Sequence, residues 1–343
     1  MASKPSVAII VNANARKFVD RPALVDRIGA LAADRAQVHV TRTREELDRA
    51  ATTIFAARTD VVVLCGGDGS YSAGATALFR AYADAQLPAV TLAPGGTVGT
   101  VARALGVAPS TIGGGTLEGV ARVLHAACSE RPIILERPTM LVRAGDAAPR
   151  GSFIFGTGLV ASFFELYDPR AAAALRRGES IDGPSGGVGL IGAATIVSRI
   201  FVESFYGGAY ARRVLDPLRC DVSVDGARLP WRASSLVVAS VIADLGLGMR
   251  VTHRGGEDPA RPHVVVSGLP PRKLGPRMTR VLRGVPIGDP GEPCFDDLVT
   301  TLSLRFPAGP GPFVVDGDLG RATSIEVSAG PILRILAPAA FAP

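Results

Sequence analysis

The first 130 residues alternate short apolar runs with stretches of helical periodicity. The apolar runs have the length of strands and contain few polar residues, whereas apolar positions recur every three or four residues in the segments between them. The expected strands are 6–12, 37–41, 60–65 and 89–93, and the expected helices are 22–33, 44–57, 72–84 and 97–105. Continuous apolar strands that alternate with helices predict a parallel sheet covered on both faces. We therefore expect an α/β domain over residues 1–132.

The pattern changes after about residue 132. Later apolar runs are short, and turn residues separate them, for example at 140–143, 220–224, 263–267, 313–315 and 324–327. Such spacing is typical of antiparallel strands. The sequence predicts a second domain over residues 133–343, an antiparallel β-sandwich with a few helices, of which 189–205 is the clearest. The last strand or the tail is expected to pack back on the first domain.

The amino-acid composition argues against nucleic-acid binding and against a zinc site. The chain has 343 residues, 47% of them apolar, which suffices for two packed cores. Only 6% are aromatic, and the basic residues are not interleaved with aromatics, so the sequence does not indicate nucleic-acid binding. Four scattered cysteines and the histidines at 39, 125, 253 and 263 show no zinc-binding spacing. With no signal-peptide pattern and no apolar run of spanning length, we expect a cytoplasmic protein.

The strongest chemical signal is a glycine-rich loop where the third predicted strand meets a helix. Glycines at such a place bring backbone N–H groups close to a phosphate, and the helix N-terminus favours negative charge. An acid between two glycines would repel a phosphate unless it holds a bridging cation or accepts a proton. The candidate nucleotide-binding residues are Gly66, Gly67, Asp68, Gly69, Ser70, Tyr71 and Ser72.

Two further segments belong to the candidate site. Residues 94–100 follow the next strand and open a helix, with Gly96 and Thr97 as candidate phosphate ligands and Thr97 as the expected cap. Late in the chain, Asp316 and Asp318 flank a glycine after a strand and could hold Mg²⁺ or supply a general base. Taken alone, Asp-Gly-Asp is more often a hairpin turn.

In this order, the segments resemble the diacylglycerol kinase catalytic-domain family, which includes bacterial diacylglycerol kinases, sphingosine kinases and ceramide kinases. The motif Ala102-Arg103-x-Leu105-Gly106 and a central Gly156-x-Gly158-x-x-Ala161 extend the resemblance over essentially the whole chain. It implies ATP, Mg²⁺ and transfer of the γ-phosphoryl group to a lipid hydroxyl, with diacylglycerol, ceramide or a related lipid as acceptor.

The resemblance also implies roles for individual residues. A first phosphate loop corresponds to Asn12, Ala13, Asn14, Ala15 and Arg16, and Thr41 corresponds to the threonine that ends the second strand. Lipid contacts fall on Gly158, Ser162 and Glu165. Asp68 and Asp316 are the implied metal ligands. The proton acceptor is Asp318 by analogy with most of the family, or Asp68 by analogy with the sphingosine kinases, and the sequence leaves both open.

Several positions depart from the family pattern. The first loop lacks the usual Asn-Pro and later glycine, and Gly99 stands in place of asparagine. Asp318 replaces glutamate and is one methylene shorter. Ser162 stands where sphingosine kinases have an aspartate that contacts the lipid head, although Glu165 lies close enough in sequence to replace it. These departures leave open a catalytically weakened lipid-binding regulatory protein.

Two small-molecule kinase families are alternatives. Phosphofructokinases carry a nearly identical Gly-Gly-Asp-Gly-Ser-Tyr loop, but their Thr-Ile-Asp-x-Asp segment is missing here. NAD kinases share the loop and the two-domain plan, but their Asn-Glu pair is missing. No P-loop motif occurs, and the loop lacks the last glycine of the dinucleotide fingerprint.

A lipid substrate implies peripheral contact with the inner face of the membrane. The candidate segment is basic and covers residues 272–283, with Arg272, Lys273, Arg277, Arg280 and Arg283. A solvated helix at the protein surface explains this segment equally well. The sequence leaves open whether the chain forms a homodimer.

Overall fold

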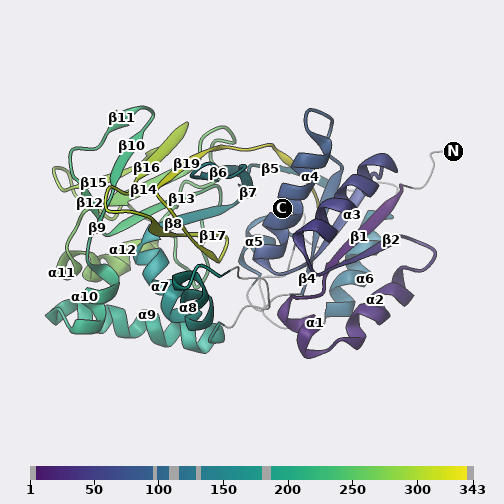
Figure 1. Cartoon of the computed structure of the whole chain (residues 1–343), viewed down its shortest axis with the longest axis horizontal. Helices are drawn as coiled ribbons and strands as arrows, with labels where there is room; N and C mark the ends of the chain where they lie inside the picture. The colour runs from purple at the N-terminus through teal and green to yellow at the C-terminus, as the bar shows by residue number, and fades with distance from the viewer. Residues whose placement is uncertain (1–4, 96–98, 108–115, 129–132, 180–186, 338–343) are drawn as a thin grey trace. The chain divides into compact units, whose positions relative to one another are not determined.

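The structure is a computed structural model that describes residues 5–95, 99–107, 116–128, 133–179 and 187–337. These residues divide into two compact units. Of the described residues, the first unit comprises those within 5–137 and 331–337, and the second comprises 138–179 and 187–330. Figure 1 shows the elements of both units.

The first unit is built on a six-stranded sheet with the order β2-β1-β3-β4-β20-β5. Its strands are β1 (Val7–Asn12), β2 (Gln37–Thr41), β3 (Val61–Gly66), β4 (Ala89–Pro94), β5 (Ile133–Arg137) and β20 (Leu333–Ala337). All neighbours are parallel except β20 and β5, which pair antiparallel. The predicted parallel sheet is confirmed, and the four expected strands lie within one residue of their predicted bounds.

Helices cover both faces of this sheet. They are α1 (Arg16–Asp20), α2 (Ala23–Ala32), α3 (Arg44–Ala56), α4 (Asp68–Tyr82), α5 (Thr100–Ala104) and α6 (Thr116–Ala127). Helices α1, α2 and α6 bury alternate residues of β1 and β3 in one core, while α3 and α4 pack together, with α4 against β3. Helix α3 begins with a capping box between Thr43 and Glu46, as the sequence predicts.

The first unit ends five residues later than the expected boundary at residue 132. Strand β5 pairs along its whole length with β20, so it completes the first sheet and does not begin the second unit. Strand β20 returns from the far end of the chain and inserts between β4 and β5. An antiparallel partner this remote in sequence leaves no local signal, which explains why the sequence places β5 in the second domain.

The second unit contains two six-stranded antiparallel sheets and a two-stranded ribbon. The outer sheet is formed by β11 (Ala227–Arg228), β10 (Asp221–Val224), β16 (Thr301–Arg305), β19 (Ser324–Ala329), β6 (Met140–Ala144) and β7 (Arg150–Ser152). The inner sheet is formed by β15 (Cys294–Leu298), β14 (His263–Ser267), β13 (Leu236–Ser240), β8 (Ile154–Gly158), β17 (Gly311–Val315) and β18 (Asp318–Ala322). The ribbon pairs β9 (Leu218–Arg219) with β12 (Ala233–Ser234). The predicted antiparallel architecture is confirmed.

Burial distinguishes the two sheets. Residues along β10 and β16 alternate between buried and partly exposed, so one face of the outer sheet meets solvent. Every residue of β13 and β14 is buried, which requires cover on both faces of the inner sheet. Helices α9 and α10 supply the cover on one face, because their apolar residues share a core with Val238 and Val265.

The helices of the second unit are α7 (Leu159–Tyr167), α8 (Pro169–Arg176), α9 (Gly189–Tyr206), α10 (Ala209–Leu215), α11 (Pro271–Leu274) and α12 (Met278–Arg283), with a 3₁₀ turn η1 (Gly275–Arg277). Helix α9 extends the predicted segment 189–205 by one residue. None of the helices in the described part of the chain is both long and apolar enough to cross a membrane.

Candidate active site

The first unit brings three of the predicted segments together at the carboxyl ends of β1, β3 and β4. The Asn12 side-chain amide donates to Ser70 Oγ at 2.8 Å, which joins the end of β1 to the loop after β3. The Gly95 N–H donates to the Gly66 carbonyl oxygen at 2.7 Å, and the Lys17 N–H donates to the Gly95 oxygen at 3.2 Å. Ligands of open α/β sheets bind at this edge.

Close packing explains two of the glycines. A Cβ on Gly66 would lie 2.4 Å from Ser70 Oγ, and a Cβ on Gly95 would lie 2.5 Å from the Phe18 ring and 3.0 Å from the Gly66 Cα. Any larger residue would therefore push these loops apart. These two glycines allow the loops to approach each other, a role that the sequence does not distinguish from approach to a phosphate.

Helix α4 begins at Asp68, four residues earlier than the predicted start at residue 72. Ser70 Oγ accepts the Gly67 N–H at 3.2 Å and so stabilises the entry to the helix. Asp68, Gly69 and Ser70 therefore form the first turn, whose N–H groups have no partner within the helix. This turn presents amide donors and a positive dipole end, as a phosphate site requires.

Asp68 has a structural partner that the sequence does not reveal. Its two carboxylate oxygens accept the backbone N–H groups of Thr100 at 2.9 Å and Val101 at 3.1 Å, so Asp68 caps the N-terminus of α5 from another element. Burial raises the pKa of the Asp68 carboxyl, while these N–H groups and the charge of Arg103 oppose the rise. The N–H groups of Thr100 and Val101 are consequently occupied within the unit.

The second loop is described only in part. Gly96 and Thr97 lie outside the described residues, so the predicted cap and phosphate contacts there stay predictions. Helix α5 begins at Thr100, after Gly99, whose φ of +64° is left-handed. Glycine and asparagine are the residues that adopt this conformation most readily. The glycine at position 99 thus suits the backbone there, although it removes a side-chain amide.

Other predicted nucleotide ligands are buried or are bonded to neighbouring strand ends. Thr41 Oγ1 donates to the Val11 oxygen at 3.3 Å, and Tyr71 Oη donates to the Ala93 oxygen at 3.0 Å. Ser72 is fully buried in α4, and Ala15, which directly precedes α1, is also buried. The Asn14 amide donates to the Arg42 oxygen at 2.7 Å, and the Ala13 N–H donates to the Thr41 oxygen at 2.9 Å. These contacts hold the strand ends together.

Lys17 is a candidate ligand that the sequence reading missed. Lys17 lies at the strand ends, because its backbone N–H donates to the oxygen of Gly95, which directly follows β4. Burial raises the pKa of the Cys65 thiol to about 12, and the positive charge of Lys17 opposes that rise. Lys17 is half-buried and has no carboxylate partner among the described residues. The neighbouring Arg16, which the sequence reading selected, is exposed and lies 4.0 Å from Asp20.

The second unit places Asp316 in a hairpin turn between β17 and β18. Asp316 and Gly317 have φ values of +48° and +94°, which define a two-residue type I′ turn. Asp316 is only 6% exposed, and its Oδ1 accepts the N–H groups of Phe153 at 3.1 Å and Ile154 at 2.8 Å. Burial raises the pKa of Asp316 to about 7.

Asp318 differs from Asp316 although only one residue separates them. Its side chain is 49% exposed, and Oδ2 pairs with the Arg150 guanidinium at 2.8 Å. Arg150 lies on β7 and Asp318 on β18, so the pair links the two sheets of the unit. The hairpin therefore turns one carboxylate inward and leaves the other accessible.

The predicted lipid-contacting residues lie on or next to α7, beside this hairpin. Gly158 precedes α7 with a φ of +66°, and a Cβ there would lie 2.5 Å from the Ser235 oxygen, so only glycine fits. Ser162 is half-buried, and Glu165 pairs with Arg176 of α8 at 3.7 Å. Phe164 lies 3.7 Å from the Cβ position of Gly317. Helix α7 and the acidic hairpin thus form one region.

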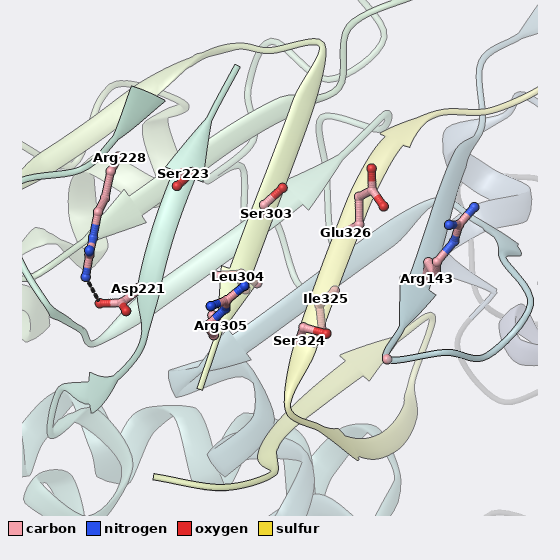
Figure 2. A pocket seen from close by; sticks show the side chains of 11 residues that line it. Arg143, Asp221, Ser223, Arg228, Ser303, Leu304, Arg305, Ser324, Ile325 and Glu326 are labelled. Atoms are coloured by element: carbon pink, nitrogen blue, oxygen red, sulfur yellow. Dashed lines mark hydrogen bonds and ion pairs between the residues drawn. The ribbon is translucent and has the colours of Figure 1, made fainter. Parts of the chain in front are cut away.

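A depression of about 380 Å³ lies elsewhere in the second unit, on the solvent face of the outer sheet (Figure 2). Charged and hydroxyl side chains from β6, β10, β16 and β19 line it, and Arg228 pairs with Asp221 at one side. This lining does not suit an acyl chain. The depression contains none of the predicted site residues.

This chain resembles a known protein family and several solved structures. The diacylglycerol kinase catalytic domain matches residues 6–123. No curated protein sequence matches the chain. Two solved structures from Bacillus anthracis strain Sterne align over 100% of both chains. One, described as a diacylglycerol kinase, has a TM-score of 0.59 at 13% identity, and the other, described as a putative diacylglycerol kinase, has 0.63 at 15%. Residues 6–123 therefore resemble the diacylglycerol kinase catalytic domain, and the chain as a whole shares the fold of these two structures.

Proposed function

We propose that the protein transfers the γ-phosphoryl group of ATP to the hydroxyl of a lipid. The observation that carries the proposal is the convergence of three loops at one sheet edge, through the Asn12–Ser70 and Gly66–Gly95 hydrogen bonds, within the segment that matches the kinase domain. The first turn of α4 offers amide donors for phosphate oxygens, and Lys17 offers a positive charge near the same strand ends.

The three candidate acids, one in the first unit and two in the second, suit different roles. Asp316 is the poorer candidate for a magnesium ligand, because it is only 6% exposed and a single oxygen, Oδ1, accepts two backbone N–H groups. Asp68 fits better, since each oxygen accepts one N–H and keeps a lone pair. Bound Mg²⁺ would neutralise phosphate charge during transfer, and Asp68 is the residue that would hold it.

We assign proton acceptance to Asp318. An acceptor must come within hydrogen-bond reach of the substrate hydroxyl, and Asp318 has an exposed carboxylate whose position Arg150 fixes. The lipid acceptor is expected beside α7, where Phe163, Phe164 and Tyr167 form an aromatic cluster with ring centroids 5.4 to 6.0 Å apart. This cluster offers apolar contact for an acyl chain next to the acidic hairpin.

Labelled ATP and a lipid panel test the proposal. Purified protein with Mg-ATP should phosphorylate at least one of diacylglycerol, ceramide, sphingoid bases and other acylglycerols, and Asp318→Asn should abolish the transfer. Asp221→Asn is the matched control, because Asp221 pairs with Arg228 on the solvent face of the outer sheet. Preferred phosphorylation of a sugar phosphate or NAD would indicate a small-molecule kinase. Nucleotide binding without transfer to any acceptor would indicate a regulatory protein.

The nucleotide part of the site has a separate test. Lys17→Ala should weaken ATP binding by about 10-fold or more, since a hydrogen bond to a charged group contributes roughly 1.5–3 kcal/mol. Arg16→Ala should change it little, because Arg16 is exposed. Equal effects of the two substitutions would refute the role assigned to Lys17.

We also propose that α9 contacts the membrane surface. Ile191 is 86% exposed, and exposed apolar side chains recur along one side of the helix at Val188, Ile191, Val202 and Phe205. Helix α9 packs against α11 and η1, which begin the basic segment 272–283. Within that segment Lys273, Arg277 and Arg280 pair with Asp289 or Glu292, so acids offset much of the charge that the sequence reading relied on.

Vesicle sedimentation tests this surface. Ile191→Glu with Val202→Glu should reduce binding to phosphatidylglycerol vesicles by at least about 10-fold, because each apolar side chain contributes roughly 1.5–3 kcal/mol when buried. Val40→Glu, at an exposed position of β2, serves as the control. Wild-type binding by the double variant would refute the assignment.

A further inference from the structure

A cluster of two histidines and one aspartate lies at one edge of the inner sheet. His263 begins β14, Asp296 lies on β15, and His253 lies in the connection between β13 and β14. Their potential ligand atoms all lie within 4.8 Å of one another. His263 Nε2 lies 2.7 Å from Asp296 Oδ1, and the two imidazole rings stand nearly perpendicular with centroids 4.9 Å apart.

Two polar atoms of this cluster are buried without a hydrogen-bond partner among the described residues. They are His253 Nδ1 and Asp296 Oδ2. Leaving a buried donor or acceptor unsatisfied is unfavourable, and native proteins rarely do so without a reason. Both atoms are good metal ligands, one an imidazole nitrogen and the other a carboxylate oxygen. A cation held by the three side chains would satisfy both.

We propose that His253, His263 and Asp296 bind a divalent first-row transition metal of the zinc class. Two imidazoles and a carboxylate match the ligands that Zn²⁺ takes in proteins, whereas Mg²⁺ prefers oxygen. Ligand atoms about 2.1 Å from a tetrahedral ion lie about 3.4 Å apart. The 2.7 Å contact between His263 and Asp296 therefore widens on binding, and His253 moves inward.

Metal binding also changes one neighbouring contact. The Arg254 N–H points at His263 Nδ1 at 3.4 Å, a long hydrogen bond. A metal on Nε2 leaves the proton of the neutral imidazole on Nδ1, so this contact must open. The cost is small because the bond is long. The Arg254 guanidinium pairs with both Glu257 and Asp297. Two carboxylates around one guanidinium leave a net negative charge beside the cluster.

This site is separate from the proposed catalytic acids and does not depend on the proposed function. The inner sheet runs in the order β15-β14-β13-β8-β17-β18, so Asp296 and Asp318 lie on opposite edge strands. Five strand spacings of about 4.8 Å separate those edges by roughly 24 Å. An ion at the histidines would therefore not contact Asp316 or Asp318, and its effect would be on the stability of this edge.

Metal titration of the untagged full-length protein tests the proposal. After dialysis against a chelator, the wild type should bind one equivalent of Co²⁺ with visible absorption bands, and Zn²⁺ should displace it. His253→Gln and Asp296→Asn should each weaken binding by at least about 10-fold, the smallest effect usual even for residues that only support a ligand. His125→Gln, at an exposed position of α6, should bind as the wild type does.

Two results would overturn the inference. One is binding of less than half an equivalent of Co²⁺ by the folded wild type, which would leave a hydrogen-bonded His–Asp pair as the whole role of the cluster. The other is unchanged affinity in His253→Gln. If both variants misfold, X-ray absorption of the zinc-loaded wild type decides the matter, because two imidazole ligands are expected and fewer would contradict the site.

Discussion

Asp316→Asn separates a buried structural acid from a metal ligand. Asparagine matches aspartate in size and tolerates the left-handed conformation that Asp316 adopts, so the type I′ turn should persist. The substitution also reproduces the neutral state of the carboxyl. Any difference in stability between the two proteins that changes with pH therefore reports the ionisation of Asp316.

The raised pKa of Asp316 determines how the free energy of unfolding should change with pH. Burial raises the pKa of Asp316 from 3.8 to about 7, so the folded protein favours the protonated carboxyl more than the unfolded chain does. The resulting stability is complete below pH 3.8 and is lost as the pH rises through about 7. The shift corresponds to roughly 4 kcal/mol in total, of which more than half falls between pH 5 and pH 8.

Urea unfolding measures this difference. Trp231 is the single tryptophan and lies in the second unit with Asp316, so its fluorescence reports the relevant unfolding step. The free energy of unfolding of the wild type should fall relative to Asp316→Asn by about 2 to 3 kcal/mol from pH 5 to pH 8. A constant difference, or one that grows in favour of the wild type, would mean that Asp316 is ionised in the fold and would refute the reasoning.

Three further predictions concern single contacts. Gly158→Ala should destabilise the second unit by about 3 kcal/mol in the same urea assay, because the new Cβ would clash with the Ser235 oxygen. Gly145→Ala is the control: Gly145 also has a positive φ, but the space around it is open, so this substitution should cost only about 1 kcal/mol. Equal effects of the two substitutions would contradict the predicted clash. Asp68→Asn should speed hydrogen exchange at Thr100 and Val101, since it removes the charged cap of α5, and unchanged exchange would show that the cap is dispensable. Thr43→Ala should lower the free energy of unfolding of the first unit by about 1 kcal/mol, measured by circular dichroism, with Thr52→Ala inside α3 as the control.

Local patterns were sufficient to predict the elements of the first unit. Apolar runs of strand length gave β1, β2, β3 and β4, and the Thr43–Glu46 spacing gave the start of α3. The boundary after Arg137 was out of reach, because β5 is defined by its pairing with β20, almost 200 residues later. The glycines at residues 67 and 69 suggest a loop, so the sequence predicts a later start for α4. In the structure, Asp68 at the first position of the helix and the Ser70 side chain, which accepts the Gly67 N–H, favour a start at Asp68.

The candidate site shows the same division between local and long-range information. The sequence identified the loops that converge, because their motifs are contiguous. It could not identify the bond between Asp68 and α5, which spans 32 residues, or the cluster of His253, His263 and Asp296, which spans 43. Lys17 was overlooked for a related reason, since only the position of Gly95 shows that the start of α1 lies at the strand ends.

The different contacts of the three candidate acids decide how their substitutions can be interpreted. Asp68 holds a helix, Asp316 holds a turn against a strand, and Asp318 is exposed beside Arg150. Loss of activity on replacing either of the first two would not by itself identify a catalytic group, because each substitution also removes backbone contacts. Replacement of Asp318 should remove transfer while leaving the unfolding free energy within about 0.5 kcal/mol, as expected for an exposed ion pair. Only such a separation of activity from stability assigns the proton acceptor.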